Sequence, residues 1–523
     1  MIRQRRLLTA AIAAVCSATL LLTACGSSNS SGGSSADAGD PVAGGAGRII
    51  QVSEPRTLDP AALGNVWASQ PELGNALYGT LMINTPDSLD IEYKMAEDFS
   101  TTDGGSTYTM KLRPGLMFTD GTPLDAAAVK FNWERMRDPA LGAGASKVSP
   151  QIAGTEVIDP TTLKVTMVQP NSHYAQAVVT SALNWIASPT ALQKGKQEFD
   201  KAPVGAGPFT LTSWTRQDEM TLTKNPGYWD APKPYLDTLT IQFVPDAAQR
   251  YNAVLSNAVD LASESNAANL QKAEDGGLRN ELVDAGGGYY MAMNTRRAPF
   301  DDERARKAVS LALDLDTINT VVYNGAGVVP TTLFPEVSPF YSDIPLTENN
   351  KDEAQALFDE LAAEGKPVAF DFTSFSTTEN KQTGEAVQAQ LSAFDNVKVG
   401  INALDSSAIG SVVAGREFQM VVTSANVLDP DTELWTSFHS QSKGNMSGIS
   451  DPQLDAALDA GRVGTTVEER KAAYDTAQER IAEVVPGVFF VRSTPSVIAG
   501  DNVQGIVMYG LGSPLPEEMW LTD

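Results

Sequence analysis

The stretch YTMKLRPGLMFTDGTPLDAAAVKF, residues 108–131, decides the local fold of this chain. Its first five residues alternate polar and apolar side chains, which is the period of a half-buried β-strand. Segments 113–115 and 120–123 contain Pro-Gly and Asp-Gly pairs, which are typical of tight turns. Asp125 then predicts the N-cap of a helix that continues through Val129. We therefore expect a strand, a turn and a helix in close succession.

The same mixture of elements continues along the chain. Strand patterns occur at 48–52, 163–168, 209–214, 220–224 and 239–244. Apolar side chains at helical spacing predict helices at 305–319, 352–363, 382–394, 452–460 and 467–485. Because no tandem repeat and no low-complexity linker separates these elements, we predict an α/β protein with lobes built from interleaved segments.

Composition excludes several classes of protein. With 523 residues, 42% hydrophobic and 20% charged, the chain is neither disordered nor fibrous. A formal charge of −26 excludes a general basic surface for nucleic acid. Two cysteines and two histidines are too few for a Cys/His zinc cluster. We therefore predict no nucleic-acid partner, no metal site and no cofactor.

The N-terminus is typical of a bacterial lipoprotein signal. Three arginines precede a mostly apolar run from Leu7 to Leu22, and Thr23-Ala24-Cys25 follows. This pattern predicts a signal peptide at 1–24 and a diacylated Cys25 as the new N-terminus. It fits a membrane-spanning helix less well, because polar residues interrupt the run. Of the next 22 residues, 13 are Gly or Ser, so we expect 25–47 to be a tether that holds the protein on the extracytoplasmic face of the cell membrane.

Further blocks accompany residues 108–131 in order along the chain. They are SEPRTLDP at 53–60, PVGAGPF at 203–209, NPGYW at 225–229, NT at 294–295 with PFDD at 299–302, and DPD at 429–431. Together these blocks resemble the family 5 extracytoplasmic solute-binding proteins of ABC importers, the peptide, nickel and oligopeptide group. The resemblance runs from about residue 48 to about residue 515.

The resemblance implies the two-lobed periplasmic-binding-protein fold, of the large α/β type with an extra subdomain and a ligand cleft between the lobes. Lobe I would comprise 48–292 and 491–523, with the subdomain at about 72–200, and lobe II would comprise 293–490. The implied function is that of a monomeric, lipid-anchored receptor. It would capture a short peptide or peptide-like compound and deliver it to ABC permease subunits.

Other functions remain open at this point. The same scaffold could bind a sugar, an opine or a metal chelate, or act as an adhesin or a sensor. A secreted hydrolase is a further alternative, since 64 acidic residues will always place some carboxylate pair near some cleft. The chain contains neither His-Glu-x-x-His nor Gly-x-Ser-x-Gly. We therefore predict a binding protein that is not an enzyme and has no catalytic residues.

One position bears on which ligands the protein could bind. In peptide-binding relatives, an aspartate just before the Asp-Pro block anchors the ligand's α-ammonium, and the matching residue here is Asn426. An asparagine can accept a hydrogen bond but supplies no charge to offset the desolvation of an ammonium. Glu54 matches an acidic position near the mouth of the cleft and could compensate; a solvated turn carboxylate is the alternative interpretation.

The remaining candidates come from the matching blocks and from aromatic side chains. An aromatic wall can hold a variable ligand by contact area, although core packing is the alternative role for each such residue. The isolated histidines His173 and His439 are interpreted as surface residues. The further candidate ligand-binding residues are Ser53, Trp185, Tyr289, Tyr290, Asn294, Ser424 and Trp435.

Overall fold

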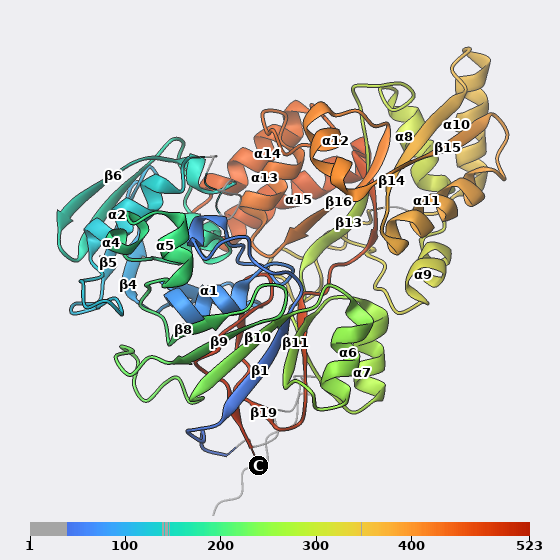
Figure 1. The fold of residues 1–523 in the computed structure, drawn as a ribbon. Helices are drawn as coiled ribbons and strands as arrows, with labels where there is room; N and C mark the ends of the chain where they lie inside the picture. The colour runs from blue at the N-terminus through green and yellow to red at the C-terminus, as the bar shows by residue number, and fades with distance from the viewer. Residues whose placement is uncertain (1–38, 139–140, 142–144, 146, 347, 523) are drawn as a thin grey trace, which may run out of the picture. The chain divides into compact units, whose positions relative to one another are not determined.

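The computed structural model describes residues 39–138, 141, 145, 147–346 and 348–522 (Figure 1). The predicted signal peptide, Cys25 and the first part of the predicted tether lie outside these residues. Residues 40–523 form one compact unit, and the fold is that of this unit. Among the described residues, no helix is both long enough and apolar enough to cross a bilayer.

A seven-stranded mixed sheet is built around β1 (Ala46–Gln51), which pairs in parallel with both of its neighbours. Ile49 lies opposite Ile241 on one side and Leu261 on the other. Because β1 begins at Ala46, it includes the last two residues of the predicted tether. The strand order is β12 (Arg279–Leu282), β18 (Ser496–Ala499), β11 (Leu261–Glu264), β1, β10 (Thr238–Phe243), β9 (Glu219–Lys224) and β8 (Phe209–Trp214).

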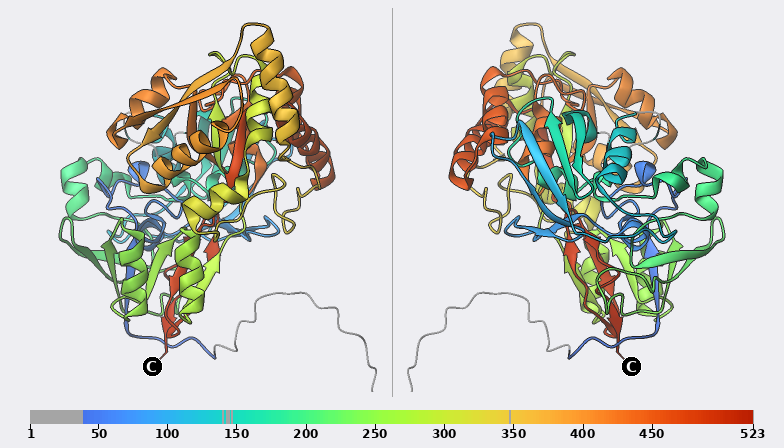
Figure 2. Two further views of the ribbon diagram at one scale, coloured as in Figure 1. Left: turned by 90° about the vertical axis from the view of Figure 1, so that its right-hand side faces the viewer. Right: turned by 90° about the vertical axis from the view of Figure 1, so that its left-hand side faces the viewer.

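Two helices cover part of this sheet, α6 (Ala247–Leu255) and α7 (Ala267–Asp275). Their buried Val254 and Leu270 pack with Ile50 from β1. Figure 2 shows that the C-terminus and the residues just before β1 lie at the same end of the sheet.

The stretch 108–131 folds as expected. In β5 (Thr107–Leu112) the side chains of Tyr108, Met110 and Leu112 are buried, and the residues between them, 109 and 111, are exposed. Asp125 caps α2 (Ala126–Arg135) by accepting a hydrogen bond from Ala128 N at 2.9 Å. β5 belongs to a four-stranded antiparallel sheet with the order β4 (Ala96–Ser100), β5, β7 (Thr162–Met167) and β6 (Ile152–Asp159).

Shorter elements connect the four-stranded and seven-stranded sheets. Helix α1 (Pro71–Tyr78) is buried along its whole length, and Asn75 within it accepts a hydrogen bond from the hydroxyl of Tyr509 at 2.7 Å. The C-terminal segment is thereby tied to the first helix. The other short elements are β2 (Met82–Asn84), β3 (Ile91–Tyr93), α3 (Tyr174–Val179), α4 (Pro189–Leu192), α5 (Lys196–Lys201), β19 (Val503–Gln504), β20 (Met508–Tyr509), β21 (Ser513–Pro514) and β22 (Trp520–Leu521).

A five-stranded sheet organises the second half of the chain. Its order is β15 (Val397–Leu404), β14 (Val368–Phe375), β16 (Met420–Val427), β13 (Gly286–Met293) and β17 (Gly487–Val491). The side chains of β13 alternate between two cores, since Met291 and Met293 belong to one and Tyr290 and Ala292 to the other. Both faces of the sheet are therefore covered, which explains why its strands are rich in apolar residues.

Helices form these two covering layers (Figure 1). Those that share a core with Met291 are α8 (Glu303–Ala312), α9 (Leu315–Tyr323), α10 (Lys351–Ala363) and α11 (Thr378–Leu391). Those on the opposite core are α12 (Ile409–Gly415), α13 (Pro430–Phe438), α14 (Pro452–Val463) and α15 (Val467–Val484). The predicted helix 305–319 is two helices, because Asp314 is extended and caps α9 by accepting from Thr317 N at 3.1 Å.

The chain passes between the two large sheets twice, at 283–285 and at 492–495. The two passages lie side by side, since Val283 N donates to Pro495 O at 2.8 Å. β13 lies in the five-stranded sheet, so the first passage comes before the predicted boundary at 292. Position 287, near the start of β13, requires glycine. Its φ is +66°, and a Cβ would lie 2.0 Å from the carbonyl oxygen of Ala425.

Candidate ligand-binding site

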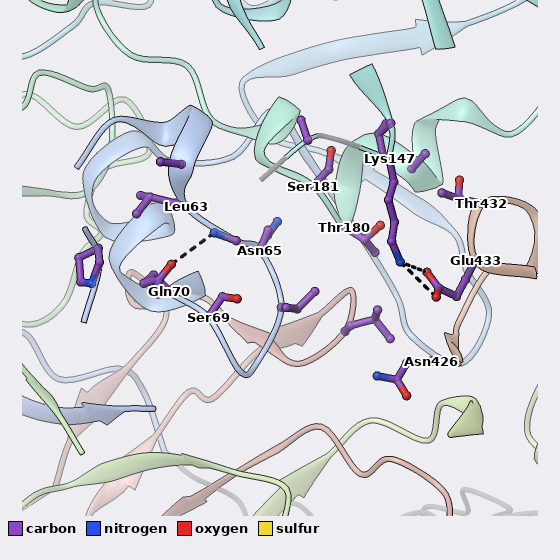
Figure 3. Close-up of a pocket in the computed structure, with 18 of the residues that line it drawn as sticks. Leu63, Asn65, Ser69, Gln70, Lys147, Thr180, Ser181, Asn426, Thr432 and Glu433 are labelled. Carbon is purple, nitrogen blue, oxygen red and sulfur yellow. Dashed lines mark hydrogen bonds and ion pairs between the residues drawn. The ribbon is translucent and has the colours of Figure 1, made fainter. Parts of the chain in front are cut away.

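A cavity of about 1050 Å³ lies where three groups of segments meet (Figure 3). The first group is the loop after β1 and the approach to α1, residues 53–70. The second comes from the region of the four-stranded sheet, between residues 84 and 196. The third is the end of β16 and the start of α13, residues 426–433, and Leu511 from the C-terminal segment completes the lining. The cavity is thus lined by segments from both halves of the fold.

Neutral amides and hydroxyls dominate the polar part of the lining. Many of them hold the wall together: Asn65 Nδ2 donates to Val179 O at 2.8 Å, and Asn84 Nδ2 donates to Gln176 Oε1 at 2.8 Å. They lie between apolar side chains, which include Leu63, Val66, Val148 and Leu428. An apolar wall with a few placed polar groups is the usual construction of a small-molecule site. The neutral polar lining residues include Ser53, Asn65, Ser69, Gln70, Asn84, Gln176, Thr180, Ser181, Asn426 and Thr432.

Asn426 differs from the other lining amides. Its Oδ1 atom is buried and accepts no hydrogen bond from the described residues. A buried acceptor without a partner is costly, so a side chain in this state normally meets a ligand or water. Asn426 lies near the end of β16, opposite Gly287 of β13. Asn426 thus lines the cavity and carries a buried acceptor that no donor among the described residues satisfies.

Every carboxylate that lines the cavity already has a cationic partner. Glu433 accepts a bond from Lys147 Nζ at 2.9 Å, and dashed lines mark this ion pair in Figure 3. Asp429 forms a two-bond pair with Arg470, both at 2.8 Å. Burial alone would raise the pKa of Asp429, but the guanidinium more than offsets this and holds the pKa below its ordinary value.

Glu54 is the third lining carboxylate. Its Oε1 accepts a bond from Trp214 Nε1 at 3.0 Å and lies 3.5 Å from a guanidinium nitrogen of Arg216. That guanidinium is stacked over the Trp214 ring at 3.4 Å from its centroid. The carboxylate is therefore already engaged within the protein.

The structure places three of the predicted ligand-binding residues on the cavity: Ser53, Glu54 and Asn426. Three others are core residues, so packing and hydrogen bonding inside the protein account for their residue types. Trp185 is fully buried and donates from Nε1 to Asn75 Oδ1 at 2.9 Å. Tyr290 packs against Phe489 with ring centroids 4.9 Å apart. Asn294 is buried and donates to Phe418 O at 2.9 Å.

The other three lie off the cavity lining and are half-buried. They are Tyr289, Ser424 and Trp435. Trp435 donates from Nε1 to Asp459 at 3.0 Å, and its ring stacks on His439 at 4.5 Å. Their role toward a ligand stays a prediction.

His439 is buried and His173 is half-buried, so neither is the exposed surface residue expected from the sequence. His439 is buried, and its stacking on Trp435 explains why the ring is covered. His173 Nε2 lies 2.7 Å from Gly464 O, and burial lowers its pKa. The neighbouring Asn171 donates to Asp431 Oδ2 at 2.7 Å. The segment 171–173 thus bonds the region of the four-stranded sheet to α13 and to the end of α14.

Sequence reasoning missed the lining residues Asn65, Asn84, Gln176 and Thr180. They are neutral polar residues scattered over more than a hundred positions, and none lies in a motif of its own. Only tertiary contact brings them to one wall, so a single sequence carries no signal for them.

The fold and the cavity define a class of protein, and comparison with known proteins identifies it. The family model of bacterial extracellular solute-binding proteins, family 5 Middle, matches residues 90–445. The chain belongs to this family, whose members serve ABC importers outside the cytoplasm.

Curated relatives lie within the same family. The chain is 31% identical over 424 residues to the glutathione-binding protein GsiB of Shigella boydii, covering 76% of this chain and 81% of that protein. It is 30% identical to GsiB of Escherichia coli K12, with the same coverage.

Solved structures confirm the two-lobed fold. The binding protein DppA of Helicobacter pylori, in complex with the peptide STSA, aligns with a TM-score of 0.77 at 23% identity, covering 92% of this chain and 98% of that one. AgaA of A. tumefaciens R10, in complex with agropinic acid, aligns with a TM-score of 0.76 at 25% identity, covering 92% and 99%.

Proposed function

We propose that this protein is a lipid-anchored receptor that captures a short peptide or peptide-like solute in the 1050 Å³ cavity and delivers it to an ABC permease. The observation that carries the proposal is the cavity itself, lined from both halves of the fold by apolar and neutral polar side chains, Asn426 among them. Its volume suits a ligand of a few residues. Relatives named for binding glutathione, a tetrapeptide and agropinic acid support this class of ligand.

The proposal includes no catalytic step. Its support is that the relatives are binding proteins and that each lining carboxylate is engaged by a cation of the protein. A pair of carboxylates acting on a glycosidic bond would need one free nucleophile or base.

Native mass spectrometry of the purified full-length protein tests the receptor. We expect a retained small compound, released on denaturation, with the composition of a peptide or peptide-like acid. A protein that retains no compound, and that binds nothing from a peptone fraction in calorimetry, would contradict the proposed function.

Asn426→Asp should raise the affinity for peptides with a free α-ammonium by roughly tenfold, because a charge-assisted hydrogen bond is about twice as strong as a neutral one. Calorimetry with trialanine and with N-acetyl-trialanine measures the change. We expect the gain for trialanine only. The exposed Asn252 on α6 supplies the matched control, and Asn252→Asp should leave both affinities unchanged.

A different result would reassign the ammonium site. If the unchanged protein already binds trialanine tightly and loses that binding on N-acetylation, Asn426 is not where specificity is set. Glu54 would then be the anchor, after release from Arg216, and Glu54→Gln would abolish the binding.

Lipid anchoring rests on Cys25 and its flanking residues. Cys25→Ala should leave an uncleaved precursor or release the protein into the medium, because the acylated thiol is the proposed point of attachment. Metabolic labelling with a radioactive fatty acid, followed by fractionation, measures this. Cys16→Ala, within the apolar run, is the control and should leave labelling intact. Normal labelling of the Cys25→Ala protein would overturn the proposed anchor.

A further inference from the structure

The last turn of α14 is completed by residues from the other half of the fold. The final carbonyls of an α-helix have no hydrogen-bond donor within the helix, so water or other residues must supply one. For α14 the donors come from two residues between β7 and α3. Ser172 N donates to Arg462 O at 3.1 Å, and Ser172 Oγ donates to Val463 O at 3.2 Å. His173 Nε2 lies 2.7 Å from Gly464 O, and because a carbonyl oxygen only accepts, this nitrogen carries the proton.

The segment that supplies these donors is anchored within its own half of the fold. Asn171 N donates to Gly105 O at 3.1 Å, and the hydroxyl of Tyr108 in β5 donates to Asn171 O at 2.6 Å. Position 105 requires glycine, since its φ is +83° and a Cβ would lie 2.2 Å from Asn171 O. The donors of Ser172 and His173 are therefore held in place before they meet α14, which lowers the conformational entropy lost on contact.

The contact joins two halves of the fold that can move apart. The four-stranded sheet is continuous along the chain with the seven-stranded sheet, whereas α14 belongs to a layer on the five-stranded sheet. The chain passes between these halves at 283–285 and 492–495. A hinge motion at the two passages would therefore separate residues 172 and 173 from α14 and break all three bonds.

The contact is also separate from the cavity. None of the residues 171–173 and 462–464 lines it. The Lys147–Glu433 ion pair joins the two halves as well, but both of its residues line the cavity, so a ligand can compete with it. The bonds to α14 favour the closed arrangement, in which the halves meet around the cavity, whether or not a ligand is present.

We propose that Ser172 and His173 form a latch that holds the two halves together before a ligand binds, so that the ligand-free protein is closed for most of the time. The latch itself goes beyond the proposed receptor function, and only its effect on binding rests on that function. Where a ligand binds the closed form, the apparent dissociation constant is the intrinsic one divided by the closed fraction. The latch therefore changes the affinity for every ligand of the cavity by one common factor.

Hydrogen exchange of the ligand-free, full-length protein tests the latch. The protein is stripped of bound compounds by unfolding and refolding, and exchange is resolved to single amides by mass spectrometry. Ser172 N donates to Arg462 O, so its exchange reports how often the latch is open. Ser172→Ala/His173→Phe removes both side-chain bonds and keeps an aromatic ring at 173. The control is Ser100→Ala in β4, which removes an exposed hydroxyl that bonds to Asp98.

We expect the amide of residue 172 to exchange at least about tenfold more slowly in the unchanged protein than in an unstructured chain. In Ser172→Ala/His173→Phe its exchange should be at least about fivefold faster, because two hydrogen bonds of the closed form are lost. Ser100→Ala should match the unchanged protein. The amides of β5 should stay protected in every variant, which verifies that the four-stranded sheet remains folded.

Two results of the exchange experiment would overturn the latch. One is exchange of the amide of residue 172 at the unstructured rate in the unchanged protein, since the halves would then be open. The other is equal protection in Ser172→Ala/His173→Phe, since the two side chains would then not hold the contact.

Calorimetry tests the effect of the latch on binding. Compounds captured from a peptone fraction should bind Ser172→Ala/His173→Phe more weakly, by one common factor of up to about tenfold. Factors that differ between compounds would contradict a latch that is separate from the cavity. Capture of no compound by the unchanged protein would contradict the receptor function, and the hydrogen exchange result would still decide the latch.

Discussion

Replacing Arg470 with methionine should destabilise the protein by about 3 to 5 kcal/mol, the usual cost of leaving one charge of a buried pair unpaired. The pair is deeply buried: the side chains of Arg470 and Asp429 are 4% and 9% exposed. The guanidinium donates two bonds to the carboxylate at 2.8 Å and a third to Gly461 O at 3.2 Å. Methionine keeps much of the apolar contact with Phe340 but leaves Asp429 charged and without its cation.

Urea unfolding followed by fluorescence and circular dichroism measures the loss. Asp429→Asn/Arg470→Met should recover at least about 2 kcal/mol of it, because asparagine is neutral and still caps α13 well. Lys381→Met is the surface control, since Lys381 and Glu385 are exposed and 4.0 Å apart, and should change stability by less than about 0.5 kcal/mol. If the double variant is as unstable as Arg470→Met alone, the loss comes from packing and the charge argument is wrong.

The same pair links the stability of the fold to the wall of the cavity. Asp429 lines the cavity and begins α13, three residues after Asn426. Next to it, Asp431 is bonded to Arg462 at 2.7 Å and to Asn171 at 2.7 Å. These buried ion pairs hold the start of α13 in place from two sides. The cavity wall at this point is therefore held by partners such as Arg470 and Arg462, which do not themselves line the cavity.

Local patterns allowed the strands and helices to be predicted where one face is buried. In β5 the alternation of Tyr108, Met110 and Leu112 could be recognised because an exposed side chain separates each buried one from the next. The break between α8 and α9 could not, because the apolar spacing runs through it. The break is caused by the extended backbone of Asp314, which is the N-cap of α9. A single N-cap residue in the middle of an apolar pattern is only a weak signal in the sequence.

The site was harder to predict than the fold, for a physical reason. Asn426 could be located because it lies at a fixed spacing from the Asp-Pro block. Trp185 was an equally reasonable ligand contact by residue type, yet its side chain is fully buried against α1. A large aromatic residue serves a core and a binding wall by the same contact area, so its type does not distinguish them.

Glu517→Gln should stabilise the protein by up to about 3 kcal/mol at pH 8, and by almost nothing at pH 4.5. Burial raises the pKa of Glu517 from 4.5 to about 7, and the negative charge of Glu518 adds to this. Its Oε2 atom has no hydrogen-bond partner among the described residues, and the Tyr228 hydroxyl donates to Oε1 at 3.4 Å. The charged form of this carboxyl is therefore poorly compensated in the folded state.

The sign of the pH dependence follows from where the proton is held. Between pH 4.5 and about 7 the folded protein keeps a proton on Glu517 that the unfolded chain has released. The free energy of unfolding contributed by this group therefore falls as pH rises through that window and is constant above it. Glutamine cannot ionise, so the free energy of unfolding of the Glu517→Gln protein should lack this contribution to the decrease with rising pH.

Urea unfolding of both proteins at pH 4.5, 6 and 8 tests the prediction. The exposed Glu156 in β6 supplies the control, and Glu156→Gln should keep the pH dependence of the unchanged protein. If Glu517→Gln is instead less stable than the unchanged protein at pH 8, the carboxylate has a compensating partner when charged. Lys94 and Lys233 are the cations whose charge lowers its pKa, and one of them would be that partner.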